Sequence, residues 1–220
     1  MKKKKELTYG DLFYLELPNS KYVAGRVLFD VEKQCSKDGI VVEHENYMDL
    51  FGGCQLIEMY KGIYDNLNDI QTFEILIPRV FVFNIDSKSN ELPYGILRHE
   101  EIDYTKVEFP ENIGDSHEKI RLMRGELHFI LHDIYEEYPE YDLFPTSQFP
   151  ITIAKMCLFM QGRKDMIVGE FYDEEGLKDC DLLYHAELRE KLYQKIGEDP
   201  NKSYYQLAKE HGYDLGRFYK

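Results

Sequence analysis

The sequence predicts an α+β fold. An N-terminal antiparallel sheet, strongly twisted or closed into a small barrel, is followed by a mixed segment and two C-terminal helices. Up to about residue 110, short apolar runs alternate with turn residues and helical spacing is nearly absent. After residue 144, helix start and stop signals replace that pattern. We therefore expect a β-rich domain over residues 1–110 and an α+β extension over residues 111–220 packed on it, or one continuous domain.

The first predicted element is a β-hairpin. Two runs of apolar and aromatic residues flank Pro18-Asn19-Ser20, a cluster that bends the chain. A turn centred on the last two of these residues places Tyr14 opposite Gly25, where an aromatic ring can cover a residue without a side chain. The same register brings Asp11 diagonal to Arg26, so that the two can pair. Both faces of the hairpin are apolar, which favours a covered sheet or a barrel.

Further strands are predicted over residues 56–60 and 75–84. Residues 107–131 leave two alternatives open: another hairpin around Gly125, or a strand that runs into a helix through Tyr138. Turn-forming residues separate the strand-like segments of the first half. They are Asp38-Gly39, Gly52-Gly53, Asp65-Asn66, the stretch 87–90 and Pro93.

The third quarter of the chain predicts one helix and one strand. Pro150 suits the first turn of a helix and Gly162 its C-terminal end. These signals favour a short buried helix over residues 151–161, with a strand as the alternative. Residues 166–172 have the composition of one further strand.

Two helices are predicted to end the chain. Apolar residues recur at four-residue spacing over residues 181–196, and Gly197 can close that helix. The last helix begins at Ser203, where Gln206 three residues later completes a capping box, and it ends at Gly212.

Charge limits the classes of partner. The chain has 41 acidic residues against 27 Lys and Arg, which gives a net charge of −14. A negative field repels nucleic-acid phosphates, and only lysines 2–5 form a basic run, so we expect no nucleic-acid partner. A basic protein is a more suitable partner.

The sequence predicts a cytoplasmic protein. Polar residues follow lysines 2–5, where a signal peptide requires an apolar segment, and no apolar run approaches the roughly 18 residues of a membrane span. The four cysteines, Cys35, Cys54, Cys157 and Cys180, form no Cys-x-x-Cys pair, which is typical of free thiols in a reducing compartment. We expect no metal, no cofactor and no membrane partner, and the sequence leaves the oligomeric state open.

The opening hairpin resembles the start of a known family. Its order is Gly10-Asp11-Leu12-Phe13, then Pro18, then Lys21-Tyr22-Val23-Ala24-Gly25-Arg26-Val27. This order resembles the immunity protein 26 family, small β-rich cytosolic proteins that accompany secreted bacterial toxins. The resemblance covers about residues 1–30 and continues weakly to about residue 110. It implies an immunity protein, not an enzyme, that binds and neutralises a cognate toxin by direct contact.

Within this resemblance, we interpret Gly10, Asp11, Gly25 and Arg26 as positions that define the fold. The surface that acts is expected elsewhere, in residues 133–142, which hold five acids and three tyrosines without Lys or Arg. Acids steer a basic partner such as a nuclease toxin, and tyrosines give rigid contact area. The alternative is a solvated loop whose tyrosines pack inward. The predicted partner-binding residues are Asp133, Tyr135, Glu136, Glu137, Tyr138, Glu140, Tyr141 and Asp142.

Two other functions remain open. His128 and His132 would share one face of a helix, with Asp133 and Glu136 near enough to complete a metal site, so a small hydrolytic or metal-dependent enzyme could use residues 128–142. On a strand, the two histidines would lie about 13 Å apart, too far for one ion. The segment also lacks the His-Glu-x-x-His order, so two ordinary histidines are favoured. The second alternative is a scaffold that binds a partner other than a toxin.

Overall fold

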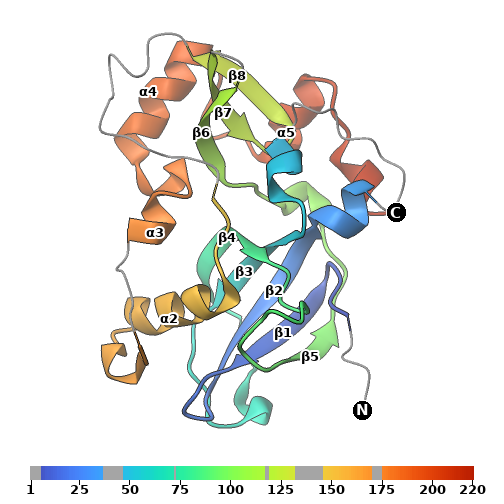
Figure 1. Ribbon diagram of the computed structural model, residues 1–220. Coiled ribbons are helices and arrows are strands. Elements are labelled where there is room, and N and C mark those ends of the chain that lie inside the picture. Colours follow the sequence, from blue (N-terminus) through green and yellow to red (C-terminus); the bar gives the residue numbers. More distant parts are fainter. Residues whose placement is uncertain (1–5, 37–46, 72, 117–118, 132–145, 170–174) are drawn as a thin grey trace. The chain divides into compact units, whose positions relative to one another are not determined.

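The computed structural model describes residues 6–36, 47–71, 73–116, 119–131, 146–169 and 175–220 (Figure 1). Antiparallel sheets and helices make up the predicted α+β fold. Contacts within the chain divide it into two units. The first unit comprises residues 1–32, 53–102 and 147–174, and the second comprises residues 33–52, 103–146 and 175–220. The chain therefore passes between the units near residues 32, 52, 102, 146 and 174.

The first unit is built on an open five-stranded antiparallel sheet. The strand order is β4-β3-β2-β1-β5, so β4 and β5 form two separate edges and the sheet is not closed as a barrel. The apolar hairpin lies inside this sheet, between β3 and β5, and most of the side chains on both of its faces are buried. Helix α2 contacts β4. The elements are β1 (Asp11–Glu16), β2 (Tyr22–Asp30), β3 (Cys54–Tyr60), β4 (Ile75–Phe83), β5 (Tyr94–His99), α2 (Pro150–Met160) and the 3₁₀ turns at Leu67–Asp69 and Lys164–Met166.

The predicted register of the hairpin is wrong by one residue. Leu17 and Lys21 close the loop through a 2.8 Å backbone hydrogen bond, and Ser20 takes a left-handed φ of 58°. The connection is therefore a three-residue loop instead of a two-residue turn. As a result Phe13, not Tyr14, lies opposite Gly25.

This shift changes which ring covers which glycine. A Cβ on Gly25 would lie 2.8 Å from the ring of Phe13 and 2.5 Å from the backbone oxygen of Glu58. The ring of Tyr14 instead covers Gly95 of β5. Aromatic rings therefore cover glycines in the sheet, as predicted, but the predicted pair of Tyr14 and Gly25 does not form.

The second unit contains a three-stranded antiparallel sheet, β6-β7-β8, and the C-terminal helices. Residues 107–131 thus form strands around a turn at Gly125, and the described part of this segment does not run into a helix. The elements are β6 (Glu111–Ser116), β7 (Lys119–Arg124), β8 (Leu127–Leu131), α3 (Glu175–Lys178), α4 (Ala186–Ile196) and α5 (Tyr204–Glu210). Short turns lie at Tyr47–Phe51, Tyr104–Lys106, Leu182–Tyr184 and Leu215–Phe218, and a π-helical turn spans Glu32–Ser36.

The start and stop signals in the sequence predict some helices and strands correctly and others wrongly. Helix α2 begins at Pro150, and the capping box of Ser203 and Gln206 that starts α5 is present, as predicted. The single helix expected over residues 181–196 is instead a 3₁₀ turn followed by α4. The strand expected over residues 166–172 does not form over residues 166–169, which finish a 3₁₀ turn and continue irregularly. In the ranges given above, no helix is long and apolar enough to cross a membrane.

The second unit buries several charged side chains, and these are paired. Glu111 has no exposed surface and accepts two hydrogen bonds from Arg189, at 2.5 and 2.8 Å. Arg124, 2% exposed, lies 3.3 Å from Glu111, also pairs with Glu108, and donates to the hydroxyl of Tyr193 at 3.1 Å. Burying a charge is costly unless it is paired, so this cluster holds the sheet to the helices of its own unit.

Candidate functional site

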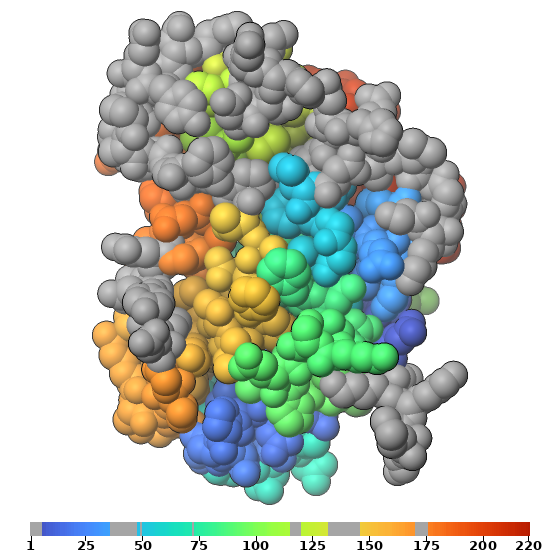
Figure 2. Space-filling model, viewed as in Figure 1, coloured from blue at the N-terminus to red at the C-terminus, as the bar shows by residue number. Residues whose placement is uncertain are grey.

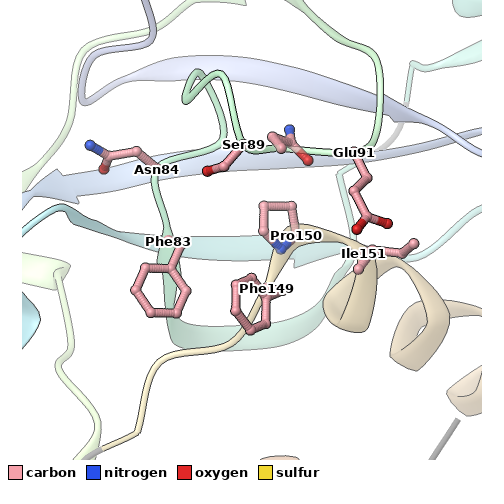
Figure 3. Close-up of a pocket in the computed structure, with 8 residues that line it drawn as sticks. Phe83, Asn84, Ser89, Glu91, Phe149, Pro150 and Ile151 are labelled. Carbon is pink, nitrogen blue, oxygen red and sulfur yellow. The ribbon is translucent and has the colours of Figure 1, made fainter.

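A hollow on the surface of the first unit is the best candidate for a binding site. It has a volume of about 190 Å³ and is formed by the end of β4, the loop after it and the start of α2 (Figure 3). Figure 2 shows the loop after β4 beside the start of α2, although these segments are far apart in the sequence. The lining residues are Phe83, Asn84, Ser89, Asn90, Glu91, Phe149, Pro150 and Ile151.

Backbone hydrogen bonds bring the two aromatic residues of the hollow together. The N–H of Phe83 donates to the oxygen of Gln148 at 3.0 Å, and the N–H of Gln148 donates to the oxygen of Phe81 at 2.9 Å. The segment before α2 therefore runs along the end of β4. Phe149 precedes Pro150 and is extended, with φ −79° and ψ 146°, because a residue before proline avoids the helical region.

The side chains of Phe83 and Phe149 stack on each other and are exposed to solvent. Their ring centroids are 4.9 Å apart with an angle of 29° between the planes, and Figure 3 shows them side by side. Phe83 is 40% exposed and Phe149 is 60% exposed. Large uncovered aromatic side chains in a cluster are typical of surfaces that bind something.

The loop after β4 is held by its own hydrogen bonds. Asn90 donates to the oxygen of Ile85 at 2.7 Å and accepts from the N–H of Leu92 at 3.1 Å. The hydroxyls of Ser87 and Ser89 bond each other at 2.8 Å. The loop therefore presents a defined edge to the hollow.

Glu91 is the charged residue of this hollow. Its side chain is exposed and points toward the start of α2 (Figure 3). It makes no ion pair or hydrogen bond with any other residue that the structure describes. Asn84, in contrast, turns its amide away from the aromatic pair, so its buried Oδ1, which has no partner among the described residues, does not serve the hollow.

The predicted partner-binding stretch lies outside the described residues. This applies to all eight of its members, Asp133, Tyr135, Glu136, Glu137, Tyr138, Glu140, Tyr141 and Asp142, and to His132. The acidic surface that they were predicted to form stays a prediction. The hollow was not predicted, because Phe83 and Phe149 are separated in the sequence and each stands beside an ordinary turn signal.

His128 lies on strand β8 and is exposed. The helical spacing that would have placed it beside His132 is therefore not what residues 127–131 adopt. Among the described residues there is no group of three or more His, Cys, Asp and Glu side chains that could hold an ion.

The four residues interpreted as fold-defining contact the sheet of the first unit. Gly10 has φ +87°, and a Cβ there would lie 2.4 Å from the backbone oxygen of Glu100. Asp11 accepts the N–H of Thr8 and lies 3.0 Å from Nδ1 of His99.

Arg26 has partners other than the one expected. It donates to Glu58 at 2.9 Å and lies 3.9 Å from Glu100. Asp11 and Arg26 thus have separate partners instead of each other, which is a consequence of the shifted register.

All four cysteines are buried, and none forms a disulfide with another described residue. Burial raises the pKa of the Cys157 thiol to about 12 and also raises the pKa of Cys54, which a hydrogen bond from Ser147 offsets in part. Both thiols therefore stay protonated at neutral pH, and neither is an activated nucleophile.

Comparison with known proteins finds no protein-family model, no curated protein and no solved structure that matches this chain.

Proposed function

We propose that this chain is an immunity protein, which binds a cognate toxin in the cytoplasm and neutralises it by direct contact. The observation that carries the proposal is the exposed aromatic hollow, together with the Glu91 carboxylate, which makes no ion pair with any residue in the described ranges. The resemblance of the opening hairpin and the net charge of −14 support the same conclusion.

The form of the hollow suits a protein partner. The centre of a protein interface is enriched in aromatic side chains, and a few such residues carry most of the binding energy. Pockets for small molecules have volumes of roughly 300–1,000 Å³. A hollow of about 190 Å³ is smaller than these, so it suits one side chain of a larger partner.

Charge determines the kind of protein. An acidic surface attracts a basic domain, speeds its association and makes the rate sensitive to salt. A toxin that acts on nucleic acid carries positive charge for its own substrate, and it would be both attracted and masked by such a protein. Residues 133–142 are the predicted source of further acidic contacts.

The test is protection of cells from a toxin. The protein is co-expressed with the basic toxin domain encoded beside its gene, and survival is compared with cells that carry the toxin alone. We expect rescue, together with a one-to-one complex whose association slows as salt is raised. Neutralising Asp133, Glu136, Glu137, Glu140 and Asp142 together should weaken the complex most at low salt. Failure to rescue cells from any neighbouring toxin would contradict the proposed function.

A further inference from the structure

We infer that the hollow formed by Phe83, Phe149 and Glu91 receives an arginine side chain of the partner. This inference deepens the proposed function and rests on it, because the arginine is supplied by the bound protein. The carrying observation is the combination of an exposed aromatic stack with an exposed carboxylate that makes no ion pair in the described ranges.

The aromatic pair supplies the apolar part of the site. A guanidinium group is planar, weakly hydrated and stacks on aromatic faces, whereas an ammonium group is strongly hydrated. Phe149 is the more exposed of the two rings, and its exposed surface is available to such a group. The methylene stem of an arginine can cover apolar surface at the same time.

Glu91 determines which sign of charge the hollow favours in its ligand. The start of α2 lies in the same hollow, and Phe149 provides no side-chain hydrogen bond to cap it, so the helix end alone would favour an anion. The Glu91 carboxylate points toward this helix start, so its negative charge lies in the same part of the hollow (Figure 3). An anionic group entering the hollow would meet that carboxylate, while a guanidinium could donate hydrogen bonds to it. The net charge of −14 favours the same choice.

A tryptophan reporter tests the inference without the partner. The chain contains no tryptophan, so Phe149→Trp introduces a single indole into the hollow and keeps an aromatic face for a cation. This variant is titrated with a short blocked peptide that contains one arginine, and with the same peptide carrying citrulline, which is neutral and nearly identical in shape.

We expect a saturable fluorescence change with the arginine peptide and none with the citrulline peptide. Adding Glu91→Gln to the reporter should weaken the arginine peptide about threefold, as expected for one exposed ion pair. Adding Glu101→Gln makes the same charge change beyond the far end of β5, and it should leave the affinity unchanged. Equal responses to arginine and citrulline, or an unchanged affinity after Glu91→Gln, would overturn the inference.

A second experiment measures the affinity of the complex with the toxin. Phe149→Ala should weaken the complex about tenfold, as expected for an interface residue that costs more than 1 kcal/mol on truncation. Ile75→Ala is the matched control, because Ile75 is 51% exposed at the opposite end of β4, and it should change the affinity less than twofold. Thermal unfolding of each variant verifies that it is folded.

The two proposals fail in different ways. A toxin complex that forms and protects cells but is unaffected by Phe149→Ala and Glu91→Gln would overturn the arginine site and leave the immunity function in place. A positive peptide titration without any toxin complex would keep the arginine site and contradict the immunity function.

Discussion

Glu111 in the second unit and Glu91 in the first unit are carboxylates in opposite environments. Glu111 is fully buried and is held by Arg189 and Arg124. Glu91 is exposed beside two uncovered phenylalanines and makes no ion pair within the described ranges. A buried charge must be paired, so Glu111 serves the fold. An exposed unpaired charge adds little to the fold and remains available to a partner.

The largest expected effect is therefore on the buried cluster. Replacing Arg124 by methionine leaves Glu111, which has no exposed surface, with one partner fewer, and we expect a loss of about 3–5 kcal/mol in the free energy of unfolding. Urea unfolding measures this loss. Arg98→Met is the matched control, because the Arg98 side chain is 49% exposed and pairs with Glu100, and it should cost less than about 1 kcal/mol. Equal losses for the two variants would show that the buried cluster does not hold the second unit.

The sheet of the first unit is sensitive to side-chain volume at Gly25. A Cβ on Gly25 would lie 2.5 Å from the backbone oxygen of Glu58, and backbone cannot move aside as a flexible side chain can. Gly25→Ala should therefore cost about 1–3 kcal/mol through overpacking between β2 and β3. The same urea experiment measures it. An unfolding free energy within about 0.5 kcal/mol of the parent protein would show that the two strands can separate to admit a methyl group.

The features predicted correctly from the sequence are those determined within a few residues. Ser203 and Gln206 satisfy each other's backbone groups at the start of α5, and Pro150 fits the first turn of α2 without any distant partner. The strand over residues 75–84 likewise follows from its own apolar run.

The predictions that were wrong or missing concern segments whose structure depends on a distant contact or on an unusual backbone conformation. Asp181 was expected to lie in a helix, but its carboxylate accepts the N–H of Leu183 and the N–H of Glu111, which starts a 3₁₀ turn instead. The left-handed Ser20 lengthens the hairpin loop, and no glycine marks that position. The hollow depends on hydrogen bonds between β4 and Gln148, and a single sequence contains no signal of that pairing.

Glu126 is an intermediate case between Glu111 and Glu91, and it predicts a pH dependence. It is 2% exposed and pairs with Arg217 through one oxygen, while its Oε2 has no hydrogen-bond partner among the described residues. Burial raises its pKa above the usual value, although Arg217 acts in the opposite direction. Since the folded protein holds the proton of Glu126 more tightly than the unfolded chain does, the stability that Glu126 contributes is full below about pH 4, near the unfolded pKa, and is lost as pH rises through the raised value.

The measurement is urea unfolding of the parent protein and of Glu126→Gln at several pH values between 4 and 7. Glutamine keeps the shape but does not titrate, so the stability of the parent relative to this variant should fall as pH rises. Glu190→Gln, on the exposed face of α4, should show no such trend. A relative stability that increases with pH would mean that the attraction of Arg217 outweighs burial.

The smallest expected effect is that of Glu91→Gln on stability. Because its side chain is exposed, this change should alter the free energy of unfolding by less than about 0.5 kcal/mol at any salt concentration, even though it weakens the binding of a basic partner. A loss above about 1 kcal/mol that disappears in high salt would have a different meaning. Glu91 would then be stabilising the uncapped start of α2 through its charge, as an acid near a helix N-terminus does. In that case its carboxylate would serve the fold as Glu111 does, and the contrast between the two residues would be lost.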